Sequence, residues 1–200
     1  MNLRDRQRDQ TRALLLEAAA ALVAERGPDA ATTRAIAAAA GVASGTVFAH
    51  FPDKTALLEA LLHDHIEAAL DDALAGLPEH DVVDQLVHVA GVLWAAYDRR
   101  PALARALLAE TLFLADPERP LARQLQRFQA WVAERLADDG EPDAMLVFSA
   151  FFSHYFGLLV AGLRGELPAE ARPMLLRALL VRLLRPADAT GSHTAPKEAG

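Results

Sequence analysis

Apolar side chains recur every three or four residues along most of this chain, the spacing that places them on one face of a helix. In residues 9–26, for example, Leu15, Ala18, Ala19 and Leu22 fall on one such face. No stretch shows the strict alternation of apolar and polar residues that is typical of a strand. The pattern predicts an all-α protein of about nine helices, at residues 9–26, 32–40, 44–50, 53–75, 81–99, 101–115, 121–137, 142–163 and 168–184.

Capping and breaking residues divide the first sixty or so positions into short helices. Thr32, Ser44 and Asp53 stand where a side-chain oxygen can accept from a free backbone N–H at a helix start. Gly41 follows the second helix, where a left-handed residue ends a helix without steric cost. Two short helices joined by such a turn form a helix-turn-helix, which places its second helix in the DNA major groove.

Residues that match a known family in register extend this motif on both sides, at 15–19, 22–23, Gly27, Thr33, 36–37, 40–42, 45–48, 50–51, Lys54 and Leu57. With them, the beginning of the chain resembles the TetR family of bacterial transcriptional repressors. The resemblance implies a three-helix DNA-binding head at residues 1–52 and a ligand-binding, dimerising body at 53–185. Residues 186–200 lack apolar periodicity and are expected to be a disordered tail.

Composition and charge fit such a protein. The chain is 52% hydrophobic and 24% charged, and because it has no cysteine it can form neither disulfides nor thiolate metal sites. Residues 1–58 hold seven basic and six acidic residues, a net charge of +1. Because the whole chain has a net charge of −7, residues 59–200 carry a net charge of −8. DNA binding needs local basic charge rather than a basic protein.

The beginning of the chain is strongly polar and shows no signal-peptide pattern. No apolar run reaches the eighteen or so residues of a membrane span, and residues 148–163 come nearest. Residues 1–8 alternate Arg with Asp or Gln and are expected to be a frayed, solvated helix start or a basic arm. We therefore expect a cytoplasmic bacterial protein that does not enter a membrane.

The resemblance assigns the DNA contacts to Thr33, Arg34, Ser44, Gly45, Thr46, Phe48, His50 and Lys54. Helix starts such as that at Thr33 favour phosphate, and residues 44–46 open the helix that faces the base edges. Phe48 stands where the family usually has tyrosine, so its side chain has no hydroxyl to donate to phosphate. Because residues 44–50 contain neither Arg nor Asn, specificity is expected to rest on Arg34, Thr46 and DNA shape.

The resemblance also places a dimer interface on the last two predicted helices, residues 142–163 and 168–184. The first of these is apolar nearly all round, so its own subunit and a partner must cover it. Gly157 and Gly162 would allow close approach there. Two heads related by a two-fold axis would then bind a palindromic operator on double-stranded DNA.

A small-molecule effector is implied within the body. Its candidate contacts are polar or aromatic residues on apolar helix faces: His63, Trp94, Tyr97, Phe113, Phe128, Trp131, Phe152, His154 and Tyr155. Each aromatic residue alone would be ordinary core, whereas together they are typical of a pocket. His154 stands out because a polar group within residues 151–160 would need a buried partner. No acidic or histidine pair dominates these helices, so we expect a hydrophobic effector.

These patterns predict a ligand-responsive transcriptional regulator, most simply a homodimeric repressor released from its operator by the effector. The prediction includes no catalytic residue, no metal site and no cofactor. An activator of the same architecture is one alternative. A helical metalloenzyme is another, but His63 and His65 are two residues apart and no Glu-x-x-His pair occurs. A partner-binding module with a weak DNA-binding head is the third, favoured by Phe48 and the low head charge.

Overall fold

The computed structural model describes residues 2–79, 81–111, 118–140 and 143–184, and within these ranges the chain is helical and has no strand. The elements are α1 (Leu3–Arg26), η1 (Pro28–Ala30, a 3-10 helix), α2 (Thr33–Ala39), α3 (Ser44–His50), α4 (Lys54–Ala75), α5 (Val82–Asp98), α6 (Pro101–Thr111), α7 (Pro120–Asp138), α8 (Ala144–Leu163) and α9 (Ala171–Leu184). The nine α-helices in these ranges confirm the predicted all-α fold.

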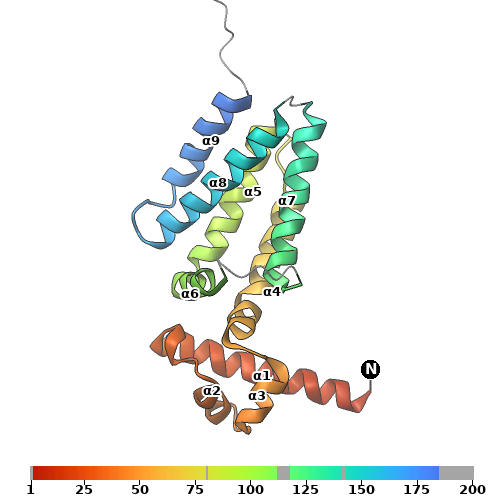
Figure 1. The fold of residues 1–200 in the computed structure, drawn as a ribbon, viewed down its shortest axis with the longest axis vertical. Coiled ribbons are helices and arrows are strands. Elements are labelled where there is room, and N and C mark those ends of the chain that lie inside the picture. The colour runs from red at the N-terminus through yellow and green to blue at the C-terminus, as the bar shows by residue number, and fades with distance from the viewer. Residues whose placement is uncertain (1, 80, 112–117, 141–142, 185–200) are drawn as a thin grey trace, which may run out of the picture.

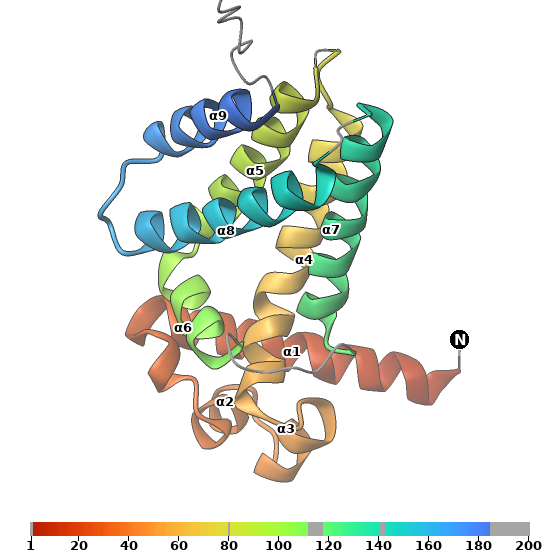
Figure 2. The same cartoon turned by 45° about the horizontal axis from the view of Figure 1, so that its top comes forward.

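The helices form two groups joined by one continuous helix (Figure 1). The head, α1 to α3, lies at one end of the molecule, and α5 to α9 form the body. Helix α4 begins at the head and runs into the body, so it joins the two groups. Figure 2 shows α1 lying across the base of α4. A change at the start of α4 is therefore positioned to act on both groups.

The head packs around buried apolar side chains that continue into the core of the body. Leu15 of α1, Ile36 of α2, Val47 of α3 and Phe51 are among them. The Oγ1 atom of Thr32 accepts from the backbone N–H of Ala35 at 3.2 Å, so the predicted cap of α2 is confirmed.

The turn between α2 and α3 follows the prediction in part. Gly41 has a φ of 68°, the left-handed conformation expected there. The prediction for Ser44 is wrong, because Ala43 occupies the N-cap position without any side-chain hydrogen bond and Ser44 is already the first helical residue. The extended backbone at Ala43 starts the helix one residue early, which leaves the exposed Ser44 hydroxyl uncommitted to a cap.

Helix α1 begins six residues before the predicted start. The Asn2 side chain accepts from the backbone N–H of Asp5 at 2.9 Å, and the Asp5 carboxylate accepts from the Asn2 N–H at 3.2 Å. This capping box satisfies two free donors and stabilises the first turn. The segment expected to be a frayed start is thus a capped, solvent-exposed helix.

Polar side chains on α7 tie that helix to the second half of α4. The Arg127 guanidinium contacts Glu67 and lies 2.6 Å from an Asp71 carboxylate oxygen. The Gln124 amide donates to Glu67 at 2.7 Å. Beneath these contacts the apolar face of α4 is buried, so α4 and α7 pack as one unit.

A buried arginine joins α9 to the rest of the body. The Arg172 side chain is buried, its guanidinium pairs with Asp98 of α5 and lies 5.6 Å from the Trp94 ring centroid. Gly162 of α8 leaves the space that this guanidinium fills, since a Cβ at that position would be 2.6 Å from Arg172 Nη1. The close approach expected at Gly162 is therefore made within the chain, whereas a Cβ on Gly157 would meet nothing within 4 Å.

The remaining predicted boundaries differ by a few residues. Helix α8 begins at Ala144 rather than at 142, and α9 begins at Ala171 rather than at 168. The prediction that no segment is long and apolar enough for a membrane span is wrong, because α8 has 20 residues with a mean hydropathy of 1.8. The tail at 186–200 and the end of the helix predicted at 101–115 lie outside the described residues.

Candidate functional site: a DNA-binding face and an effector pocket

The start of α3 is open to solvent. Ser44 and Gly45 are exposed, and Thr46 is half-buried. Phe48 is 58% exposed, an unusual placement for a large apolar ring in a free protein. Val47 and Phe51 point into the core instead, as expected, so α3 presents one face to the head and the other to solvent.

The start of α4 lies next to the start of α2. A hollow of about 240 Å³ is bordered by Thr33 at the first turn of α2 and by Lys54 at the first turn of α4. The Lys54 ammonium is 3.3 Å from a carboxylate oxygen of Asp29, itself a fully solvated side chain. Two predicted phosphate contacts are thus neighbours, while Arg34 is exposed on α2 and His50 is half-buried at the end of α3.

A second hollow, of about 270 Å³, lies inside the body between α4, α5, α7 and α8. Its wall is mainly aliphatic and aromatic, and its polar members are Glu59, Tyr97, Arg119, Gln124 and Tyr155. We call it the body pocket. Its largely apolar wall with a few polar groups is typical of small-molecule sites.

Three of the predicted effector contacts, Tyr97, Phe128 and Tyr155, line the body pocket. Phe152 packs behind them, with its ring centroid 5.3 Å from that of Phe128. Trp94 is buried next to the pocket and donates its Nε1–H to the Tyr155 carbonyl at 3.2 Å. Tyr97, Phe128 and Tyr155 therefore form part of the pocket wall, and Phe152 and Trp94 pack against that wall.

The other predicted contacts lie elsewhere. His63 and Trp131 are half-buried and do not line the pocket, and Phe113 is outside the described residues. The reason given for His154 is wrong, because its side chain is exposed on α8 and its Nδ1 lies 2.9 Å from the Ala150 carbonyl oxygen. Phe151 and Tyr155 of the same helix are buried, whereas the His154 side chain faces solvent.

The two pocket tyrosines remain neutral. Burial raises the pKa of Tyr97 to about 12. Burial, with Tyr97 nearby, raises the pKa of Tyr155 well above its ordinary value. Both phenols therefore keep their protons at neutral pH and present only uncharged hydroxyl groups.

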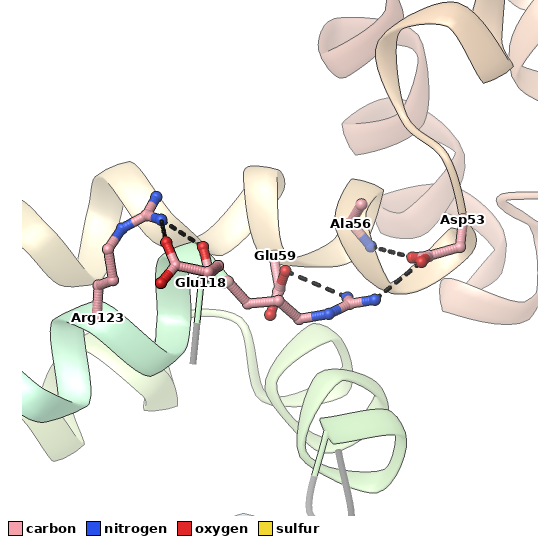
Figure 3. Close-up of polar contacts among 6 residues, drawn as sticks. Asp53, Ala56, Glu59, Glu118 and Arg123 are labelled. Carbon is pink, nitrogen blue, oxygen red and sulfur yellow. Dashed lines mark hydrogen bonds and ion pairs between the residues drawn. The ribbon is translucent and has the colours of Figure 1, made fainter. Parts of the chain in front are cut away.

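Sequence reasoning missed the charged group of this pocket. Arg119, at the entry of α7, places Nη1 3.4 Å from an oxygen of Glu59 and Nη2 2.8 Å from an oxygen of Asp53 (Figure 3). The other Asp53 oxygen accepts from the Ala56 N–H at 2.6 Å and caps α4. The available signal was Glu59 itself, an acid on the apolar face of α4 that needs a basic partner when buried.

The head of the chain matches a known protein family. The model of the family described as "Bacterial regulatory proteins, tetR family" matches residues 15–61, which run from the middle of α1 into α4. The HTH-type transcriptional repressor Rv3405c of Mycobacterium tuberculosis is 39% identical over 102 residues, covering 50% of this chain and 48% of that protein. The chain belongs to the TetR family.

Further similarities extend beyond the head. The HTH-type transcriptional repressor KstR of Mycolicibacterium smegmatis is 30% identical over 137 residues, 66% of each chain. The solved structure of the fatty acid degradation regulator FadR from Bacillus halodurans has a TM-score of 0.62 at 22% identity, over 86% of this chain and 99% of that one. That second likeness shows a TetR fold alone.

The chain spans about half the length of the first curated relatives it matches. TetR proteins are described as regulatory proteins, so family membership confirms that the chain is not an enzyme.

Proposed function

We propose that this TetR protein is a cytoplasmic, DNA-binding transcriptional regulator, a repressor that binds a palindromic operator as a homodimer. The observation that carries the proposal is the head, where a family-matched helix-turn-helix leaves the start of α3 open to solvent. The relatives named as repressors support repression rather than activation.

The exposed residues suggest a division of roles on DNA. Ser44, Gly45 and Thr46 would approach base edges, with Thr46 offering both a hydroxyl and a methyl group. Phe48 would pack against sugar or a thymine methyl, because it has no hydroxyl for phosphate. The residues that would hold phosphate are Thr33, Arg34, His50 and Lys54.

The last two helices supply the surface for dimerisation. Six of the large apolar side chains that are exposed in the described chain belong to them: Met145, Leu146, Val160, Met174, Leu175 and Val181. Such a concentration of exposed apolar side chains marks an interface. A membrane would cover α8 too, but the same kind of exposure on α9 favours a partner protein that packs on both helices.

The body pocket would hold the effector. Its apolar wall supports the expected hydrophobic molecule, and Tyr97, Phe128 and Tyr155 are the predicted contacts that lie there. Binding in this pocket would change the position of α4, since Glu59, Ile66 and Leu70 on that helix form one side of it.

Selection of bound duplexes from a random pool tests the proposal. Enrichment of a palindrome whose half-sites are about one helical turn apart is expected for a dimer with two heads. Weak, salt-sensitive binding without any enriched sequence would instead favour a partner-binding module with a residual head. A monomer in size-exclusion chromatography at micromolar concentration would contradict the dimer.

A further inference from the structure

The Arg119 guanidinium is placed both in the body pocket and on the first turn of α4. It lines the pocket together with Glu59, and its Nη2 reaches Asp53, the residue that caps α4 beside the head. Figure 3 labels the two carboxylates, Glu59 and Asp53, and its dashed lines mark their contacts with the guanidinium. Any movement of Arg119 in the pocket therefore changes its contact with Asp53 at the junction of head and body.

The two carboxylates differ in how easily they can be released. The Glu59 side chain is 3% exposed, so water cannot replace the guanidinium there. The Asp53 side chain is 45% exposed and can be solvated by water. When Arg119 is displaced, the contact with Asp53 is thus the one that breaks first.

We propose that Arg119 couples the body pocket to the DNA-binding head, and that the effector is an uncharged apolar molecule that displaces this arginine from Asp53. The inference rests on the proposed function, since it requires an operator and an effector. Loss of the contact would free the first turn of α4 from the start of α7 and lower the affinity of the head for its operator. Arg119 acts here as a positioning residue, since it reaches DNA only through α4.

The charges around Arg119 argue for an uncharged effector. One guanidinium already contacts two carboxylates, so an anionic effector would add a third negative charge at the same place. The neutral phenols of Tyr97 and Tyr155 add no positive charge. An apolar body that fills the space lined by Leu121, Ala122 and Leu125 needs no charged partner.

Pocket-filling substitutions test the coupling without any ligand. Ala122→Phe places an uncharged apolar ring in the pocket, and Arg119→Met removes the guanidinium but keeps an apolar stem. Arg127→Met is the matched control, because it breaks ion pairs between the same helices farther along α4 from the head. Operator affinity is measured for each variant and for Ala122→Phe combined with either methionine change, using the selected duplex.

Ala122→Phe alone is expected to weaken operator binding by about fivefold or more, the lower end of measured allosteric couplings. Its effect should fall to nearly nothing in the Arg119→Met background and persist in the Arg127→Met background. Equal effects of Ala122→Phe in all three backgrounds, or no effect in the wild type, would overturn the coupling. A wild type that enriches no duplex would contradict the proposed function itself, and the inference with it.

Asp53→Asn gives an independent readout if Arg119→Met fails to fold. The amide oxygen can still accept from Ala56 and cap α4, while the ion pair is lost. Removing a negative charge next to DNA would by itself tighten binding. The coupling predicts weaker binding instead, by about fivefold or more, and tighter binding would overturn it.

The effector class is tested with the probe pair 1-octanol and octanoate, which share a chain and differ in charge. At equal concentrations, 1-octanol is expected to weaken operator binding of the wild type more than octanoate does, and to have little effect on Arg119→Met. A stronger effect of octanoate, or no effect of 1-octanol, would contradict the uncharged class.

Discussion

Gly162→Ala tests how α8 and α9 are held together beneath the proposed dimer surface. The added Cβ would lie 2.6 Å from Nη1 and 2.8 Å from Cζ of Arg172, closer than non-bonded atoms tolerate. Arg172 has little room to retreat, because its side chain is buried and its guanidinium is fixed by Asp98 and Trp94. Displacing it would break the pair with Asp98 and leave a charge without its partner.

The magnitude follows from two opposing terms. Alanine in a helix interior is more favourable than glycine by about 1 kcal/mol. Losing one partner of a buried ion pair costs about 3 kcal/mol or more, and the lower figure applies because the Asp98 side chain is 32% exposed. The free energy of unfolding should therefore fall by about 2 kcal/mol, which in a chain of this size lowers Tm by about 4–8 °C.

Urea and thermal unfolding, followed by circular dichroism at one fixed protein concentration, measure this change. Gly157→Ala in the same helix is the control, since its Cβ would meet nothing within 4 Å and the helix propensity term should prevail. Gly162→Ala in an Arg172→Met background should also lose its penalty. A Gly162→Ala protein as stable as the wild type, or more stable, would refute the reasoning.

Three further predictions address the head and the interface. Thr32→Ala removes the cap of α2 and should lower the free energy of unfolding by about 1 kcal/mol in urea titrations, with Thr11→Ala, whose hydroxyl only donates back to the Gln7 carbonyl, as the milder control. Burial opposes ionisation of Asp53, but the hydrogen bonds from Ala56 and Arg119 prevail and lower its pKa below 3.8, so its stabilising contribution should hold at neutral pH and fade as the pH drops below that value. The difference in free energy of unfolding between wild type and Asp53→Asn should therefore shrink from about pH 6 to about pH 3. A difference that grows over this range would contradict the prediction. Leu175→Glu places a charge on the exposed face of α9 and should yield monomers in sedimentation, whereas an unchanged dimer would argue against that interface.

The head could be predicted closely because its signals are local. A threonine oxygen at the start of α2 and a glycine at its end act within one turn, so Thr32 and Gly41 could be read from the sequence. Ser44 could not, because serine is favourable both as a cap and as a first helical residue. The backbone conformation of Ala43 decided between the two, and side-chain identity does not encode it.

The pocket depended on contacts between distant residues. Arg119 and Glu59 are 60 positions apart, and only the packing of α7 on α4 brings them together. His154 shows the opposite error, since a polar residue within an apolar run was expected to be buried. In a helix with two covered sides the hydrophobic run does not reveal which residues face the subunit's own core, and His154 lies on the exposed side.

The most direct test of the central claim is the affinity of the protein for its selected duplex as a function of salt, for wild type, Thr46→Ala and Lys54→Ala. Lys197→Ala, which changes the other lysine of the chain, is the control. Lys54→Ala should weaken binding to all sequences and lower the salt slope by about one, while Thr46→Ala should cost about 1–3 kcal/mol and relax sequence preference. Identical affinities and slopes for the wild type and both head variants would contradict DNA binding through α3 and the start of α4.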